Sequence, residues 1–472
     1  MKFVFSFLAL AVTTSLFSQN ALATSVGPGS PETNVICNYS HTKPDDAIMM
    51  LDMPGMAMLH DFFGNIHTDA FTKTTDLQNQ PENTCDNQAD SSAYWVPALR
   101  LEDGTIVKPS YQKTYYQSEN VEEYPLSPLP QGLELLAGNH RGTGPTPWVL
   151  NYYCKSSGYS QTPFSSCAPY KPGIVQFNIG LRFPDCWDGV TLKAKPKQGI
   201  KNAVYSTGGV CSVNYPVKIP RANMNVAYEV NTDNPIDMTK IQLSLDPVME
   251  NGKLVEKWGS IYTAHGDFMN GWSAQSAQYM TEHCMNRPGS CNKNIPFSYS
   301  TALEDTTIAN LDDADKNFAD DKTVRAQGPD DRSTQSKRQI GLIKFKLPEW
   351  AEGKDIESAT DVKYFLRNAT INGSDQTAGM MYYMPVSNSW RGDSVTWNNA
   401  PECGGTKAGQ LYLDNELKFR YTDVDKAVRH AIKDNQTEIS FCIIGNDTGR
   451  KYVMDSSESR NPPILMLRSV YP

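Results

Sequence analysis

The sequence lacks the excess of positive charge that a nucleic-acid-binding protein needs. It contains 43 lysines and arginines against 52 aspartates and glutamates, which gives a formal net charge of −9. Binding to nucleic acid requires a basic stripe or patch, and anionic membrane surfaces attract polybasic segments. The charge balance therefore argues against both partners.

Long hydrophobic runs are missing after the N-terminus. No later apolar stretch reaches the roughly eighteen residues that a membrane-spanning helix requires, so no transmembrane segment is expected. At the N-terminus, Lys2 supplies a positive charge, residues 3–17 are largely apolar, and Ala21-Leu22-Ala23 resembles a cleavage site. This pattern predicts a signal peptide over residues 1–23 and a secreted protein, either extracellular or periplasmic.

Several catalytic fingerprints are missing too. The GxSxG, HExxH, P-loop and dinucleotide-binding motifs do not occur, which sets aside the serine hydrolases, zincins and nucleotide enzymes that carry them. No CxxC pair occurs either, and this argues against a zinc site made of cysteines.

The cysteines instead indicate disulfide bonds. There are ten, and an even number in an exported chain favours disulfides over metal or thiol chemistry. Spacing alone does not determine connectivity. The local spacings suggest the pairs Cys154–Cys167, Cys186–Cys211, Cys284–Cys291 and Cys403–Cys442, with Cys37–Cys85 left over.

The composition predicts a mainly β fold. Glycine (32 residues) and proline (30 residues) are frequent, which suits short strands joined by turns. One helix is expected over Ser273–Cys284, where apolar residues recur at helical spacing. From Arg338 onward, evenly spaced short strands separated by turn residues predict a β sandwich of the jelly-roll type.

A shift in composition suggests where one domain gives way to the next. Residues 304–331 hold nine acidic residues against three basic ones, which is typical of a solvated linker or loop. We therefore expect a β-rich domain with few helices over residues 24–298, followed by a β jelly roll over residues 299–472.

The segment His60–Thr72 concentrates polar groups among aromatic residues. It holds two of the seven histidines and two aspartates. Burial and mutual charge shift the proton affinities of such groups, as in catalytic and ligand sites. The alternative is a polar turn whose histidines cap strands and whose phenylalanines fill the core.

Residues about 35–295 resemble the family called domain of unknown function nineteen-ninety-six, which occurs in secreted fungal and actinobacterial proteins. Five blocks in order carry the resemblance. They are His60 with Phe62-Phe63-Gly64-Asn65 and Thr68-Asp69-Ala70-Phe71, then Ala93 to Leu99, Gly132-Leu133 with Ala137-Gly138, Phe183 to Val190, and His265 to Trp272.

This chain departs from the pattern of that family at three positions. Family members usually carry histidines where Met58, Asn202 and Tyr215 stand here. The resemblance therefore does not support a metal site made of several histidines, and neither a metal nor another cofactor is expected. The polar residues of the blocks that remain are His60, His265, Asp267, Asp185 and Asp188.

Residues about 300–472 resemble the disaggregatase-related, DNRLRE-type module, which is carbohydrate-binding module family ninety-six. The matching pieces include Leu342 to Leu347, Trp390 with Ser394 to Pro401, Asp423-Val424, and Ser456-Ser457-Glu458 with Pro462 to Leu465. The resemblance implies a β jelly roll. It also implies binding to a polysaccharide, since the founding examples bind acidic polysaccharides such as alginate.

Together these features predict two sets of site residues. A histidine near a carboxylate can act as a general acid or base, and a carboxylate pair can hydrolyse a glycoside; both require the blocks to meet in one cleft. The expected catalytic residues are His60, His265, Asp267, Asp185 and Asp188, and the expected substrate-binding residues are Tyr94, Trp95, Trp187, Trp272, His67 and Asp69.

Each set has a structural alternative. Asp185 and Asp188 are also ordinary turn formers, and large aromatic residues more often belong to the core than to a sugar-stacking surface. A glycine between His265 and Asp267 suits a ligand that approaches the backbone closely.

Three functional hypotheses follow. The first is a secreted protein that hydrolyses a polysaccharide, as a glycoside hydrolase or another polysaccharide-degrading enzyme, and is held on its substrate by the binding module. The second is a non-catalytic polysaccharide-binding, matrix or adhesion protein. The third is a metalloprotein that uses His60 and His67. The expected partner is a glycan, and the expected state is a monomer.

Overall fold

The computed structural model describes residues 32–287, 290–329, 335–348, 359–369, 379–413, 419–446 and 449–470. The expected signal peptide, residues 1–23, lies outside this part of the chain. The predicted mainly β fold is confirmed, because large antiparallel sheets dominate the described residues. Among them, no helix combines the length and the apolar character needed to cross a membrane.

One large sheet organises the N-terminal region, by which we mean residues 32–295. Its strand β6 alternates buried and half-buried residues without a break, as a sheet with one face on a core requires. The order across the sheet is β7 (Glu134–Gly138), β17 (His265–Met269), β3 (Ala93–Pro97), β2 (His60–Gly64), β1 (Glu32–Lys43), β6 (Tyr111–Gln117), β14 (Arg221–Asn231), β10 (Ile174–Arg182), β8 (Leu150–Cys154) and β9 (Gly158–Ser160), with β18 (Ser290–Asn292) beside β1.

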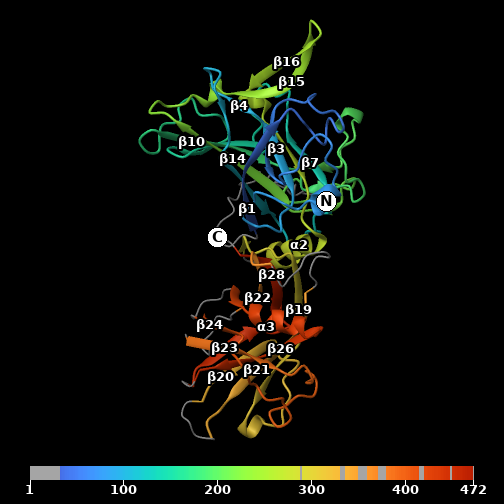
Figure 1. Ribbon diagram of the computed structural model, residues 1–472, viewed down its shortest axis with the longest axis vertical. Coiled ribbons are helices and arrows are strands. Elements are labelled where there is room, and N and C mark those ends of the chain that lie inside the picture. The colour runs from blue at the N-terminus through green and yellow to red at the C-terminus, as the bar shows by residue number, and fades with distance from the viewer. Residues whose placement is uncertain are drawn as a thin grey trace, which may run out of the picture.

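This sheet curls until it nearly closes on itself (Figure 1). The edge strand β7 contacts β10, although the two are far apart in the strand order. The enclosed core contains Tyr94, Val96 and Phe268 from one side and Leu181 and Met224 from the other. Residues of β17 and β3 that point away from this core lie on the outer face of the sheet, where the candidate site forms.

Two small sheets flank the large one. The first has the order β12 (Ala203–Val204), β11 (Cys186–Trp187) and β13 (Val217–Lys218), and the second has the order β16 (Lys253–Ser260), β15 (Gln242–Glu250), β4 (Leu99–Arg100) and β5 (Ile106–Val107). The hairpin of β15 and β16 projects from the molecule (Figure 1). It turns at Asn251-Gly252, where both residues have positive φ, as a two-residue hairpin turn demands.

The helix expected over Ser273–Cys284 is present. Helix α2 spans Ala274–Tyr279 and continues as a π-helix, η4, over Met280–Met285. The Ser273 side chain accepts a hydrogen bond from the Ser276 N–H, which caps the helix start. The other described helical segments are α1 (Asp76–Asn79), α3 (Asp425–Lys433), η1 (Pro196–Gln198), η2 (Met238–Lys240), η3 (Ile261–Thr263) and η5 (Leu311–Asp313).

All ten cysteines are paired, and the suggested connectivity is confirmed in full. The disulfides are Cys37–Cys85, Cys154–Cys167, Cys186–Cys211, Cys284–Cys291 and Cys403–Cys442.

The C-terminal region, residues 296–469, is a β sandwich. Its long strand β19 pairs with β28 over residues 298–301 and with β21 over residues 302–309, so one strand joins two layers that pack on a shared core. The order is β24 (Gly409–Leu413), β23 (Gly379–Val386), β26 (Glu438–Gly445), β21 (Gln339–Lys346), β19 (Ser298–Ala309), β28 (Ile464–Ser469), β22 (Val362–Ala369) and β25 (Phe419–Asp423), with β20 (Thr323–Gln327) between β21 and β27 (Lys451–Asp455).

The acidic stretch at residues 304–331 is not a simple linker. It includes most of the second half of β19 and all of β20. Within β19, Asp305 is buried and accepts a hydrogen bond from the Ser457 N–H at 2.7 Å. The expectation of a solvated loop was wrong for these strands because paired backbone groups and buried alternate residues outweigh the charge.

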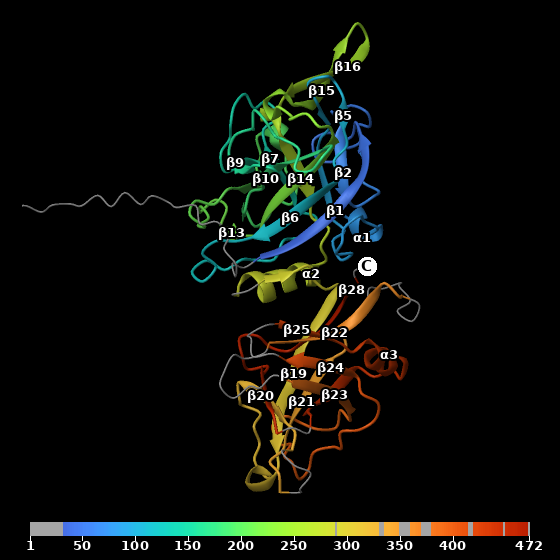
Figure 2. The same cartoon turned by 90° about the vertical axis from the view of Figure 1, so that its left-hand side faces the viewer.

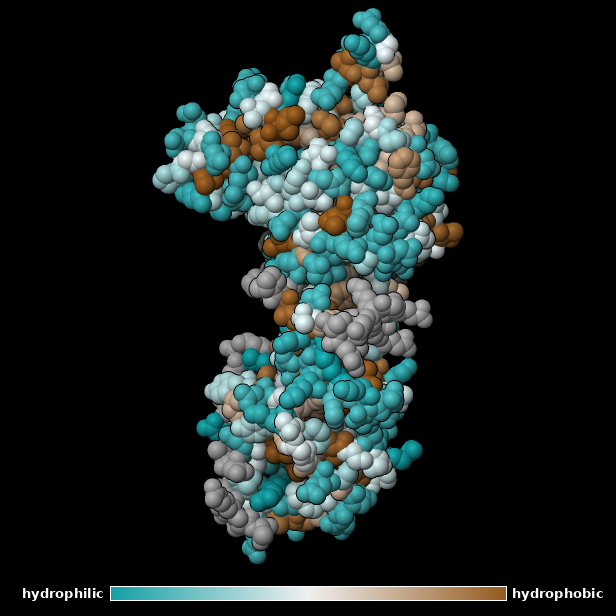
Figure 3. Space-filling model, viewed as in Figure 1, coloured by the Kyte–Doolittle hydropathy of each residue, from teal (hydrophilic) through white to brown (hydrophobic). Residues whose placement is uncertain are grey.

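Helix α2 and η4 lie between the two regions in both ribbon views (Figures 1 and 2). The Tyr279 ring lies 5.2 Å from that of Tyr299, and Arg367 of β22 donates a hydrogen bond to the Tyr279 hydroxyl at 3.1 Å. The space-filling view shows two lobes with a narrower waist and a mainly hydrophilic face (Figure 3). The two regions therefore meet through packed side chains.

Candidate functional site

His60 is the first residue of β2 and is completely buried. Its Nδ1 lies 2.9 Å from the backbone oxygen of Asp45. Its Nε2 is buried without a hydrogen-bond partner. Burial lowers the pKa of His60 to about 4, because the charged imidazole loses its hydration. The ring is therefore neutral at physiological pH.

His265 and Asp267 are alternate residues of β17, so their side chains lie on the same face of the sheet. The Nδ1 of His265 lies 2.9 Å from the backbone oxygen of Thr263. Burial lowers the pKa of His265 to about 4, and the neighbouring His60 lowers it as well. Burial raises the pKa of Asp267 far above its ordinary value, and the nearby Asp46 and Glu134 act in the same direction.

Gly266, between these two residues, serves packing. A Cβ atom at this position would lie 2.7 Å from Met224 Cε and 2.8 Å from Leu181 Cδ1. Both neighbours belong to the core inside the curled sheet. The glycine thus gives room to two core side chains on the inner side of the sheet, and this explains it without a ligand close to the backbone.

The structure brings His60, His265 and Asp267 together. Strand β3 lies between β2 and β17, and it pairs Pro97 with His60 and Trp95 with Asp267. One potential ligand atom from each of the three polar side chains lies within 4.8 Å of those from the other two. The two imidazole ring centroids are 6.1 Å apart. Residues separated by about two hundred positions in the chain therefore form one cluster.

A cavity of about 560 Å³ opens over this cluster. His265 and Asp267 are part of its wall, while His60 lies beneath them. The exposed side chains of Arg141, Lys197 and Lys201 surround the same cavity. Its size and its mixture of polar and apolar walls are those of a small-molecule or sugar site.

Three further polar residues belong to this site and were missed from the sequence. Asp46 is buried and accepts hydrogen bonds from the backbone N–H groups of Ile48 and Met49. Glu134 is buried in β7, and burial raises its pKa to about 7. The His140 ring centroid lies 6.1 Å from that of His265. The scarcity of histidine was the one signal that could have drawn attention to His140.

Two of the three positions at which the resembled family usually carries histidine also reach this cavity. Met58 and Asn202 contribute to its wall. Asn202 donates hydrogen bonds to the backbone oxygens of Glu134 and Leu192. Tyr215 instead donates to the Lys201 oxygen at 3.1 Å. The departures from the family pattern thus change the lining of the cavity.

Asp185 and Asp188 are not part of the cluster. Asp185 is buried and accepts hydrogen bonds from the N–H and the hydroxyl of Ser206, each at 2.7 Å, and its carboxylate lies 3.6 Å from Arg221. Asp188 accepts from the N–H groups of Val190 and Thr191. Burial opposes its ionisation, but these two bonds lower its pKa overall. The structural reading of both aspartates therefore fits their surroundings.

The aromatic residues expected to stack on a sugar are mostly core residues. Tyr94 and Trp95 are fully buried, and Trp272 is 1% exposed. The Tyr94 hydroxyl donates to Asp90 at 2.7 Å, and Trp272 donates to the Tyr116 hydroxyl at 3.0 Å. Sugar stacking does not fit such burial, because no ring face reaches solvent. Only Trp187 is half-buried, and its indole N–H donates to the Thr191 oxygen.

His67 and Asp69 lie on the turn after β2 and do not reach the cavity wall. The Nε2 of His67 is 3.3 Å from the Glu82 carboxylate. Asp69 accepts a hydrogen bond from the Phe71 N–H at 2.9 Å. Within the segment His60–Thr72, His60 therefore joins the cluster, whereas His67 and Asp69 belong to a separate turn.

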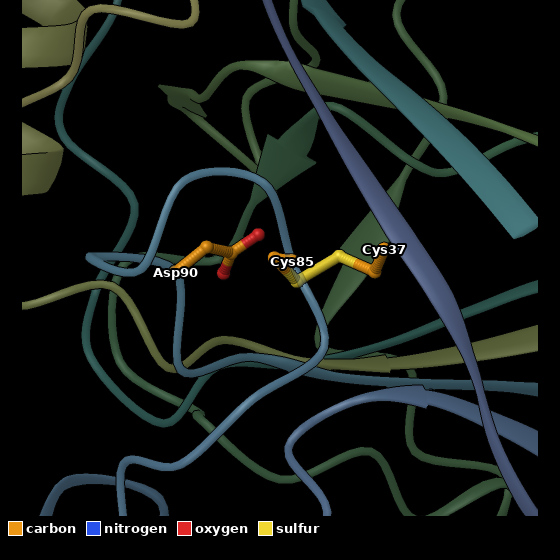
Figure 4. Close-up of side chains that lie close together, drawn as sticks. All are labelled: Cys37, Cys85 and Asp90. Atoms are coloured by element: carbon orange, nitrogen blue, oxygen red, sulfur yellow. A yellow bond between two sulfur atoms is a disulfide. The ribbon is translucent and has the colours of Figure 1, made fainter. Parts of the chain in front are cut away.

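A second group of potential metal ligands consists of Cys37, Cys85 and Asp90 (Figure 4). Its atoms are already bonded to other protein groups. The two sulfur atoms are bonded to each other, so they are not thiolates that could bind a metal. Asp90 accepts hydrogen bonds from the Ser92 N–H and the Tyr94 hydroxyl. This group is therefore structural.

The comparisons with known proteins divide the chain in two. Residues 46–272 match the family described as Domain of unknown function (DUF1996). Residues 296–469 match Carbohydrate-binding module family 96. A search of curated proteins gives no match. Both resemblances read from the sequence are confirmed, because the two family models match these two parts of the chain in the expected order.

Proposed function

We propose that this is an exported, monomeric, carbohydrate-active protein that hydrolyses a polysaccharide. The domain at residues 24–298 would cleave the polymer, the module at residues 299–472 would hold it, and the signal peptide at residues 1–23 would direct export. One observation carries the proposal: a chain with a carbohydrate-binding module also has a cavity walled by His265 and Asp267. The five disulfides are compatible with an extracellular protein.

The polar groups of the cavity suit hydrolysis. Cleavage of a glycosidic bond needs one group that accepts a proton from water and one that donates a proton to the leaving oxygen. The Nε2 of His265 is available as the acceptor because Nδ1 is committed to the Thr263 oxygen. The carboxyl group of Asp267 is the proposed donor, and His60 orients the pair from below.

The charge around the cavity favours an acidic polymer. Arg141, Lys197 and Lys201 are exposed at the cavity against one exposed carboxylate, Asp246, whereas Asp46 and Asp267 are buried. Exposed cations attract and orient anionic substrates. We therefore expect uronate-containing polysaccharides to be better substrates than neutral glucans.

The test is incubation of the mature chain with a panel of acidic and neutral polysaccharides, with new reducing ends measured by mass spectrometry. The His265→Ala variant should lose product release while keeping its melting temperature. The matched control is His430→Ala, because His430 is 76% exposed on α3 in the other region. Equal product release by the native protein and the His265→Ala variant would refute the proposed site.

A second candidate function is binding without catalysis. It is favoured by the burial of Tyr94, Trp95 and Trp272, which removes the expected sugar-stacking surface from the N-terminal region. In that case the protein would sediment with insoluble polysaccharide and would release no product from any member of the panel.

A further inference from the structure

The hydrogen bonds of His60 and His265 determine where each ring carries its proton. Each Nδ1 faces a backbone carbonyl oxygen at 2.9 Å. A carbonyl oxygen can only accept a hydrogen bond, so each Nδ1 must be the protonated nitrogen. The lone pair of each neutral ring is therefore on Nε2. Histidines that bind metals are held in this way, with the second ring nitrogen donating to a carbonyl or carboxylate.

The atoms that face the centre of the cluster have no other partner. His60 Nε2 and Asp267 Oδ2 are buried and make no hydrogen bond, and both residues are at most 2% exposed. An unsatisfied buried polar atom is costly, and native proteins contain few of them. These two atoms belong to residues whose potential ligand atoms lie within 4.8 Å of one another, so one bound ion would satisfy both.

The surroundings hold further buried carboxyl groups. Asp46 and Glu134 are buried and lie close enough to Asp267 to act on it electrostatically. The cationic side chains at this cavity, Arg141, Lys197 and Lys201, are solvent-exposed. Three buried carboxyl groups beside two imidazole lone pairs form an environment that favours a small cation over an anion or a neutral group.

We propose that His60, His265 and Asp267 bind a divalent first-row transition-metal ion. One potential ligand atom of each residue lies within 4.8 Å of those of the other two, and the proposed ligands are the two Nε2 atoms, which carry the lone pairs, and one carboxylate oxygen. Ligands about 2.1 Å from a tetrahedral ion are roughly 3.4 Å apart, so small side-chain rotations complete the set. Three protein ligands leave at least one position open toward the cavity, as in catalytic rather than structural metal sites.

The nitrogen ligands select the class of ion. Imidazole suits zinc, iron, nickel and copper, whereas magnesium and calcium prefer an all-oxygen set. The site should therefore bind Zn²⁺ strongly and Mg²⁺ weakly. This inference stands independently of the proposed hydrolysis. If the cavity does cleave glycans, His60, His265 and Asp267 would hold the ion, which would supply Lewis acidity there, and the proton transfers proposed for His265 and Asp267 would then apply to the metal-free protein.

The test uses the untagged, full-length mature chain. After treatment with a chelator and dialysis, Zn²⁺ is titrated in by isothermal titration calorimetry, and Mg²⁺ is titrated in parallel. We expect one Zn²⁺ per chain and a higher melting temperature with Zn²⁺, because an ion that binds only the folded state stabilises it. No stoichiometric Zn²⁺ binding, or equal affinity for Mg²⁺, would overturn the proposal.

Variants locate the ion. Asp267→Asn preserves the shape of the side chain and should fold, yet it should bind Zn²⁺ at least about 100-fold more weakly, and His265→Ala should do the same. His430→Ala should bind as the native protein does. Native-like affinity in both cavity variants would overturn the assignment. Zn²⁺ binding without product release would refute the proposed hydrolysis and leave the metal site intact.

Discussion

The aspartates of the β11 turn and the polar residues of β2 and β17 were expected to share one active site, yet their surroundings are opposite. Asp185 and Asp188 have their carboxylate oxygens occupied by backbone N–H groups, a hydroxyl and Arg221. His60 and Asp267 each keep a buried atom without a partner. A carboxylate with satisfied hydrogen bonds stabilises a turn, whereas an unsatisfied polar atom in a cavity wall is kept at a cost to stability.

The comparison predicts that Asp185 is the more important of the two acids for stability. Asp185→Ala removes the acceptor of two Ser206 bonds and leaves Arg221 beside an empty position. Arg221 keeps its second partner, Glu119, so we expect a loss of about 3 kcal/mol in the free energy of unfolding, mainly from the two lost Ser206 bonds. Urea denaturation measures this loss. A value under about 1 kcal/mol would contradict the structural role.

Asp90 tests whether burial or hydrogen bonding controls the pKa of a carboxyl group whose hydrogen bonds are all made. Burial raises the pKa of Asp90 to about 6 despite its bonds to Ser92 and Tyr94. The folded state thus binds this proton more tightly than the unfolded state, so the contribution of Asp90 to stability is fully present below about pH 4 and is lost as pH rises to about 6. Relative to Asp90→Asn, the native protein should lose about 3 kcal/mol across that interval.

Thermal unfolding of the native protein and the Asp90→Asn variant between pH 4 and 7 measures this difference. Parallel pH profiles for the two proteins would show that the hydrogen bonds, and not burial, control the proton affinity of Asp90.

In contrast to Asp185→Ala, a substitution at Asp267 should stabilise the metal-free protein. Replacing a buried carboxyl group that has an unsatisfied oxygen with a neutral amide should raise the free energy of unfolding of the metal-free protein by about 2 kcal/mol. The measurement is chemical denaturation of Asp267→Asn in the presence of a chelator. A destabilised variant would mean that the Asp267 carboxyl group has a structural partner, and the contrast with Asp185 would disappear.

The smallest effect is expected at Asp188. Its two acceptor bonds to Val190 and Thr191 lie in a partly exposed turn, so Asp188→Ala should cost about 1 kcal/mol. Because these bonds lower the pKa of Asp188 overall, this contribution is present above the ordinary pKa and is lost as pH falls below it. The difference in melting temperature between the two proteins should therefore shrink in acid.

Much of the fold could be predicted because its signals are local. Alternation marks strands such as β10, helical spacing marks α2, and close cysteines such as Cys284 and Cys291 are paired. The prediction of a loop at residues 304–331 was wrong. It was based on the local charge, whereas β19 and β20 are stabilised by strands far away in the chain.

The candidate site was predictable only in part. The spacing of His265 and Asp267 places both on one face of any strand, and this needs no tertiary information. The aromatic residues misled because an exposed ring and a core ring have the same local sequence. Tyr94 and Trp272 are buried by packing that involves Tyr116 and Phe268, and nothing near them in the chain indicates this.

By itself, the sequence determined the strand-rich architecture, the disulfide pairs, the two families and the common face of His265 and Asp267. Each of these depends on neighbours in the chain or on a pattern along it. Only the tertiary structure decided that His60 joins them while His67, Asp185 and Asp188 do not. The first reason is strand order, since β2 and β17 both pair with β3 and so lie close together. The second reason is burial, because some buried polar atoms have hydrogen-bond partners and others do not.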